Sequence, residues 1–161
     1  MRSSRSLANN RWRCDHGWDV DLDDGSTNYV ITNNVFLSSG LKWREGYNRT
    51  GDNNVFADGK MMSVHVWPAN SGDVFTHNIF SGYLPVSPDA WGKQLDYNLF
   101  TIASSLTAAH GYGVDAHSAS GAAGFVDPTD GGSCSSEAKA WCHWTTSIVC
   151  TPRPRPAKRS A

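Results

Sequence analysis

The tetrapeptide Asn33-Asn34-Val35-Phe36 recurs along the chain with its second asparagine and its phenylalanine unchanged. The later copies are Asn53-Asn54-Val55-Phe56, His77-Asn78-Ile79-Phe80 and Tyr97-Asn98-Leu99-Phe100. Each copy reads x-Asn-aliphatic-Phe, and the asparagines in its second position are separated by 20, 24 and 20 residues. Tryptophans follow a similar period, at Trp18, Trp43, Trp67 and Trp91. A period of 20 to 25 residues indicates a solenoid in which each repeat forms one coil.

The composition favours strands over helices in these coils. The chain contains 15 glycines and 7 prolines, which disfavour helices, and the leucine-rich repeat signature is absent. Apolar and polar residues alternate at 19–23, 41–44 and 63–67, as expected for strands with one buried face. We therefore predict an all-β fold, a right-handed parallel β-helix of about five coils over residues 15–128. Its asparagine ladder is predicted to consist of Asn34, Asn54, Asn78 and Asn98.

Length and charge restrict the class of protein. The 161 residues (17.5 kDa, 39% hydrophobic) fit one folded domain, and no apolar run reaches the roughly 18 residues of a membrane helix. No signal peptide is visible, so we expect a cytoplasmic protein or a chain that has lost an export signal. Eight of the 14 basic residues lie in 1–13 and 151–161, which leaves an acidic middle that argues against nucleic acid. Segments 1–14 and 129–161 are expected to be poorly ordered. The four cysteines lack disulfide or zinc-ligand spacing.

Stacking of coils predicts which residues of successive strands lie side by side. We aligned two of the strands by the glycines that follow them, Gly25 and Gly46. The resulting pairs are Asp21 with Lys42, Asp23 with Arg44, and Asp24 with Glu45. The first two pairs are expected to form cross-strand salt bridges. In the third pair, two carboxylates lie on backbone positions about 4.8 Å apart, where their negative charges repel each other.

Two adjacent carboxylates suggest glycosidase chemistry. Retaining glycosidases hold two carboxyl groups about 5–5.5 Å apart, and mutual repulsion raises one of the two pKa values. Asp24 and Glu45 share the inward phase of Leu22 and Leu41, so they face solvent only if the chain turns at the glycines that follow. Asp23 therefore stays an alternative to Asp24 as the nucleophile.

Three stretches carry a resemblance to a known family. Residues 16–29, 40–46 and 64–67 resemble the right-handed, pectate-lyase-like parallel β-helices of carbohydrate-active enzymes, and most closely the β-xylosidases of glycoside hydrolase family 120. The similarity covers about residues 15–128. It implies a retaining hydrolase, or a fragment of one, with Glu45 as acid/base and one of Asp21, Asp23 and Asp24 as nucleophile.

The same stretches predict how a substrate would be bound. The expected partner is an oligosaccharide or glycan, and neither nucleic acid nor membrane. Lys42, Arg44 and His65 are expected to contact it, with Trp67 as a stacking surface. The hydrolase needs no cofactor or metal. Two alternatives stay open: a calcium-dependent polysaccharide lyase, in which Asp19-x-Asp21-x-Asp23 would contribute to a Ca²⁺ site, and a non-catalytic glycan-binding β-helix.

Overall fold

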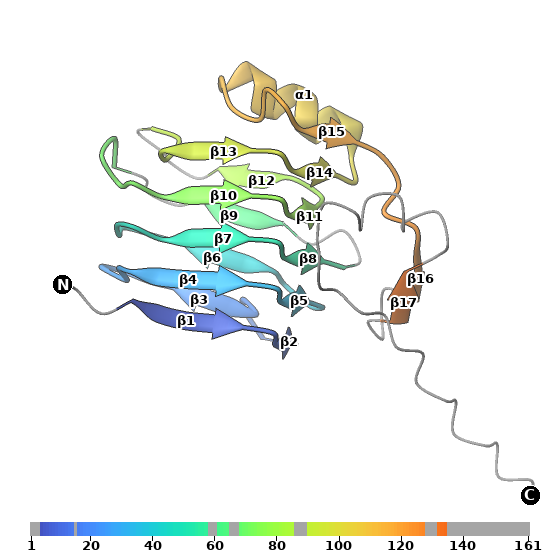
Figure 1. Ribbon diagram of the computed structural model, residues 1–161, viewed down its shortest axis with the longest axis horizontal. Coiled ribbons are helices and arrows are strands. Elements are labelled where there is room, and N and C mark those ends of the chain that lie inside the picture. Colours follow the sequence, from blue (N-terminus) through green and yellow to red (C-terminus); the bar gives the residue numbers. More distant parts are fainter. Residues whose placement is uncertain are drawn as a thin grey trace, which may run out of the picture.

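The protein is a parallel β-solenoid of about five coils, as the repeat predicts (Figure 1). The computed structural model describes residues 4–14, 16–57, 61–64, 68–85, 90–127 and 132–134. Three parallel sheets run along the solenoid, and each coil contributes one strand to sheet A.

The strands are distributed over the sheets as follows. Sheet A contains β1 (Arg5–Ala8), β4 (Tyr29–Thr32), β7 (Thr50–Asp52), β10 (Val74–Thr76) and β13 (Gln94–Asp96). Sheet B contains β2 (Arg11–Trp12), β5 (Val35–Phe36), β8 (Val55–Phe56), β11 (Ile79–Phe80), β14 (Leu99–Phe100) and β15 (Ala119–Ser120). Sheet C contains β3 (Val20–Leu22), β6 (Leu41–Trp43), β9 (Met62–Val64) and β12 (Tyr83–Pro85). A separate antiparallel pair consists of β16 (Phe125–Asp127) and β17 (Gly132–Cys134).

The predicted asparagine ladder is confirmed, and it has one more rung than expected. The backbone N–H of each asparagine donates to Oδ1 of the next, at 3.0, 3.0, 2.9 and 2.9 Å. The rungs are Asn10, Asn34, Asn54, Asn78 and Asn98. The residue before each rung has a φ between 54° and 59°, a left-handed bend that carries the chain from sheet A to sheet B. This bend explains why asparagine, which tolerates positive φ, occupies several of these positions.

The first rung corrects one expectation about the ends of the chain. Asn10 lies within segment 1–14, which was expected to be poorly ordered, but β1 and β2 pair in register with β4 and β5. The described part of the solenoid therefore includes β1, from Arg5 onward. Residues 132–134 form β17, and the rest of the 129–161 segment lies outside the described residues.

Aromatic side chains fill the interior. The repeat phenylalanines Phe36, Phe56, Phe80 and Phe100 are fully buried. Phe36 and Phe56 stack with their ring centroids 4.5 Å apart, and Phe80 and Phe100 are 4.6 Å apart. Trp43 is also buried, in agreement with the inward phase of its strand.

The far end of the solenoid is covered by helix α1 (Ala103–Gly111), which packs on β14 and β15 (Figure 1). Ala109 is part of the buried core, and Leu106 and Val114 pack against that core. Asp115 ends the ladder, because its Oδ1 accepts the Asn98 side-chain amide at 2.8 Å. No helix among the described residues is both long and apolar enough to cross a membrane.

Candidate functional site

The expected ion pairs lie on the outer side of sheet C. Strands β3 and β6 pair in the register that the glycine alignment predicts, with Asp21 opposite Lys42. Lys42 Nζ lies 2.9 Å from Asp21 Oδ2, and Arg44 Nη1 lies 3.2 Å from Asp23 Oδ1. Both contacts are cross-strand pairs between the first and second coils.

The chain turns immediately after these strands, which brings the third pair to the surface. Gly25 has a φ of 75°, and Ser26 N–H donates to Asp23 O at 3.0 Å to close the turn. A Cβ on Gly46 would collide with Ser26 O, so only glycine fits beside this turn. The Asp24 side chain is consequently 68% exposed, and the inward phase of its strand does not bury it.

One guanidinium holds three carboxylates together. Besides its contact with Asp23, Arg44 places Nε 3.1 Å from Asp24 Oδ1 and 3.3 Å from Glu45 Oε2. Since both oxygens contact the same nitrogen, the Asp24 and Glu45 carboxyl groups are direct neighbours beside the Arg44 guanidinium. Four of the predicted site residues, counting Arg44, therefore share one cluster, with Asp21 and Lys42 beside it.

Two carboxyl groups of this cluster, those of Asp23 and Asp24, have pKa values displaced in opposite directions. A hydrogen bond with the Glu45 carboxyl raises the pKa of Asp24, and partial desolvation adds to the effect. Desolvation also acts to raise the pKa of Asp23, but the Lys42 charge and the Arg44 hydrogen bond outweigh it and lower that pKa. Desolvation acts to lower the pKa of Arg44, but Asp24 and Glu45 outweigh it, so Arg44 stays charged. The pKa of Asp23 thus lies below its ordinary value and the pKa of Asp24 above it.

A buried ion pair that the sequence analysis did not identify supports this cluster from inside. Arg49 and Asp73 are both fully buried, and Arg49 Nη2 donates to Asp73 Oδ2 at 2.6 Å. Arg49 Nη1 donates to the backbone oxygen of Arg44 at 2.6 Å, and its guanidinium lies 5.1 Å from the Trp43 ring centroid. Arg49 therefore fixes the backbone from which the Arg44 side chain projects.

The aspartate that begins the Asp19-x-Asp21-x-Asp23 pattern has a structural role. Asp19 Oδ1 accepts Cys14 N–H at 2.7 Å, and its Oδ2 accepts three backbone N–H groups of the next coil at 3.0 Å each. Those donors belong to Ser38, Ser39 and Gly40. Its carboxylate is therefore occupied by backbone amides, and it joins the first coil to the second.

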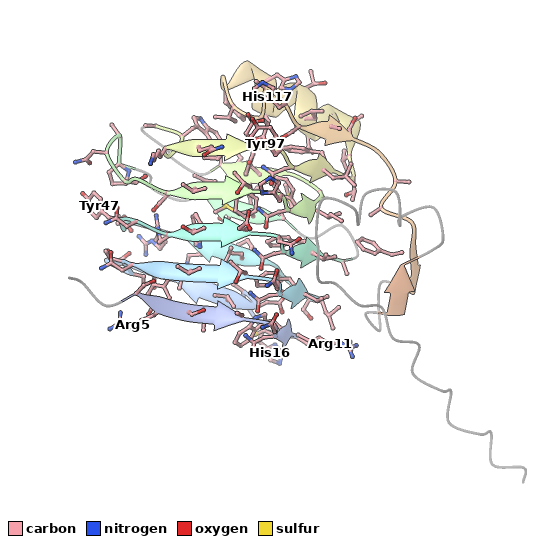
Figure 2. All side chains as sticks on the ribbon, in the orientation of Figure 1. Arg5, Arg11, His16, Tyr47, Tyr97 and His117 are labelled. Carbon is pink, nitrogen blue, oxygen red and sulfur yellow. The ribbon has the colours of Figure 1, made fainter. Side chains whose placement is uncertain are left out.

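A column of two histidines and a tyrosine, which the sequence analysis also did not identify, lines the bends between sheets A and B. The rings of His77, Tyr97 and His117 stack at centroid distances of 5.7 and 5.2 Å, and Figure 2 shows Tyr97 and His117 near the α1 end. His117 Nδ1 lies 2.6 Å from Asp96 Oδ2, and His77 Nδ1 lies 2.8 Å from Asp52 Oδ1. The ladder period indicates this column, because two of the rings occupy the x position of the repeat.

The remaining predicted contacts are not placed. His65 and Trp67 lie outside the described residues. Within the described ranges, no group of three or more His, Cys, Asp and Glu side chains has the arrangement of a metal site. Comparisons with protein-family models, with curated proteins and with solved structures each return no match. The likeness to glycoside hydrolase family 120 therefore stays a prediction from the quoted motifs, and what the structure establishes is the parallel β-solenoid.

Proposed function

We propose that the chain is a carbohydrate-active β-solenoid that hydrolyses glycosidic bonds with retention at the Asp23, Asp24 and Glu45 cluster. The observation that carries the proposal is the opposite displacement of the Asp23 and Asp24 pKa values around a single guanidinium. Neighbouring carboxyl groups whose pKa values are pushed apart provide one nucleophile and one acid at the same pH. The motif resemblance adds β-xylosides as the substrate class.

In this proposal the ionised Asp23 carboxylate attacks the anomeric carbon. The shared proton of Asp24 and Glu45 passes to the glycosidic oxygen, so that the leaving sugar departs as an alcohol and a glycosyl ester forms on Asp23. The deprotonated pair then takes a proton from water, which attacks the same carbon and releases Asp23. Lys42 and Arg44 keep the nucleophile ionised and present donors to sugar hydroxyls.

The roles within the pair differ from those implied by the resemblance. The resemblance assigns the acid/base role to Glu45 alone, whereas the raised pKa of Asp24 supports a proton shared between Asp24 and Glu45. Either single substitution is then expected to weaken proton donation without abolishing the nucleophile.

The test measures the hydrolysis of 4-nitrophenyl β-xyloside and of xylobiose by the whole chain. Asp23→Asn is expected to lower turnover of both substrates by at least about a thousandfold. Asp24→Asn and Glu45→Gln are expected to slow xylobiose by about 10²–10⁴-fold and the activated aryl substrate much less, since its leaving group needs little protonation. Asp52→Asn is the matched control, because it removes the charge of a half-buried aspartate on sheet A rather than on sheet C. Unchanged turnover by Asp23→Asn would overturn the proposal.

A non-catalytic glycan-binding solenoid is the second candidate. It is favoured by the ion pairs that Asp21 and Asp23 form with Lys42 and Arg44, since such pairs also occur as purely structural cross-links between strands. Xylo-oligosaccharide binding measured by calorimetry, without turnover of either substrate, would support this candidate. The lyase alternative would use Lys42 or Arg44 as its base. It has less support, because the raised pKa of Arg44 opposes such a role and Asp19 already binds backbone amides.

A further inference from the structure

The ring of Tyr47 is exposed and has no structural partner among the described residues. It is 42% exposed, and its side chain makes no ring contact, cation contact or hydrogen bond with any described residue. Every other tyrosine of the chain packs against an aromatic ring or a cation: Tyr29, Tyr83, Tyr97 and Tyr112. Figure 2 shows Tyr47 at the margin of the solenoid, on the side where the strands of sheet A begin. Its ring is therefore available to a ligand.

The backbone that carries this ring also carries the acidic pair of the candidate site. Tyr47 N–H donates to Thr27 Oγ1 at 3.3 Å, and that hydroxyl donates to Gly25 O at 3.0 Å. Gly25 immediately follows Asp24 and donates its own N–H to Glu45 O at 2.7 Å. Because Glu45 precedes Tyr47 by only two residues, these bonds hold the ring in a fixed place beside the Asp24–Glu45 pair.

Two side-chain amides lie at the same bend. Asn28 N–H donates to Tyr47 O at 2.9 Å, and Asn48 follows Tyr47 directly. Asn48 Nδ2 lies a long 3.4 Å from Asn28 Oδ1, and Asn28 Nδ2 donates no hydrogen bond within the described ranges. A Cβ on Gly72 would lie 2.8 Å from Asn48 Oδ1, so glycine there leaves room for this amide.

This combination of groups matches the chemistry of a sugar ring. One face of a pyranose carries C–H groups that pack on an aromatic ring, and its rim carries hydroxyls that bond to amides and carboxyl groups. The bend offers the Tyr47 ring, the amides of Asn28 and Asn48, and the neighbouring carboxyl groups of Asp24 and Glu45.

Charge decides which sugars fit. The candidate site has four acidic and two basic side chains: Asp21, Asp23, Asp24, Glu45, Lys42 and Arg44. Acids thus outnumber bases, and the carboxylate of a uronic acid would meet a surplus of negative charge. A neutral sugar meets no such repulsion.

We propose that Tyr47, with Asn28 and Asn48, forms a binding subsite for a neutral pyranose next to the Asp24–Glu45 pair. The inference rests on the proposed hydrolase for its place beside that pair, and it narrows the substrate class to uncharged pyranosides. The ring packs under the apolar face of the sugar, and the two amides bond its hydroxyls.

Calorimetry with ligands that are not turned over tests the subsite separately from the chemistry. The probes are xylotriose with sulfur in place of its glycosidic oxygens, which resists hydrolysis, and trigalacturonate. The whole chain is expected to bind the neutral probe at least about tenfold more tightly than the anionic one, a difference of about 1.4 kcal/mol. No binding of thioxylotriose, or an equal affinity for trigalacturonate, would overturn the proposal.

Variants of the ring identify the contact. Tyr47→Ala should weaken thioxylotriose at least about tenfold, and Tyr47→Trp, which keeps an aromatic face, should retain most of the affinity. Tyr97→Ala is the matched control, because Tyr97 is 47% exposed but its ring stacks between His77 and His117. Urea midpoints verify that each variant folds. A loss of affinity by Tyr97→Ala as large as that by Tyr47→Ala would overturn the proposal.

The subsite and the hydrolase can fail independently. Binding that depends on Tyr47, in a chain that does not hydrolyse 4-nitrophenyl β-xyloside, would support the subsite and remove the proposed hydrolase. Hydrolysis of xylobiose with thioxylotriose affinity unchanged by Tyr47→Ala would support the hydrolase and overturn the subsite.

Discussion

Replacing the central rung of the ladder should destabilise the whole solenoid. Asn54 is fully buried, and its Oδ1 accepts both the backbone N–H and the side-chain amide of Asn34, at 3.0 and 3.1 Å. Its Nδ2 donates to Ile31 O and to Asn78 Oδ1, each at 2.9 Å. Asn54→Ala removes all four hydrogen bonds and leaves the buried N–H of Asn34 without an acceptor.

The expected magnitude follows from this inventory. An orphaned buried N–H costs about 1–3 kcal/mol, and each lost hydrogen bond contributes about 1 kcal/mol or less. Because the remaining partners of Asn54 keep other bonds, we expect a total loss of about 3 kcal/mol in the free energy of unfolding. Urea titration followed by tryptophan fluorescence measures it, since the chain has seven tryptophans.

The end rung provides a matched control for this experiment. Asn10→Ala removes the same side chain but orphans no described backbone N–H, because Asn10 Oδ1 accepts no bond from the described residues. We expect a loss of about 1 kcal/mol. Similar losses for Asn54→Ala and Asn10→Ala would refute the idea that the acceptor role of each rung stabilises the solenoid.

Two further predictions concern buried and exposed charges. Arg49→Met should lower the free energy of unfolding by about 3–5 kcal/mol, because it leaves the Asp73 carboxylate buried without its cation. Adding Asp73→Asn to this variant should recover part of the loss. A loss under about 1 kcal/mol for Arg49→Met alone would contradict the prediction. Desolvation acts to raise the pKa of Asp96, but hydrogen bonds from His117 outweigh it and lower that pKa. Asp96 therefore stabilises the fold above its unfolded pKa of about 3.9, and this contribution is lost as pH falls through the lower folded value. His117→Ala should reduce stability at neutral pH and flatten its decline below about pH 4, as measured by urea midpoints; an unchanged acid slope would count against the pair.

The repeat motif predicts the later coils but not the first described coil. Asn34, Asn54, Asn78 and Asn98 are visible because an aliphatic residue and a phenylalanine follow each one. The first rung instead reads Asn9-Asn10-Arg11-Trp12. The exposed Arg11 occupies the position where later coils place an aliphatic side chain, so the motif loses its signature while β2 still pairs in register with β5.

The buried Arg49–Asp73 pair illustrates a second limit of the sequence. The two residues are 24 positions apart, which is a coil step, and they immediately precede Thr50 and Val74, which pair in register. The period therefore contains the information that they meet. Arginine is rarely fully buried, however, and only the packing against Trp43 and Arg44 O shows that this one points inward.

What the candidate site can do likewise depends on contacts that the coil register alone does not predict. Register alone predicts that Asp21 meets Lys42 and that Asp23 meets Arg44, and an array of one acid for each base would be a structural cross-link between coils. The site departs from that array because Arg44 also contacts Asp24 and Glu45, so three carboxylates share one guanidinium. Close carboxylates disfavour one another's ionised form, and the hydrogen bond with Glu45 raises the pKa of Asp24. The surplus of acid over base, which depends on the turn at Gly25 and on the reach of one side chain, is therefore the feature that favours chemistry over cross-linking.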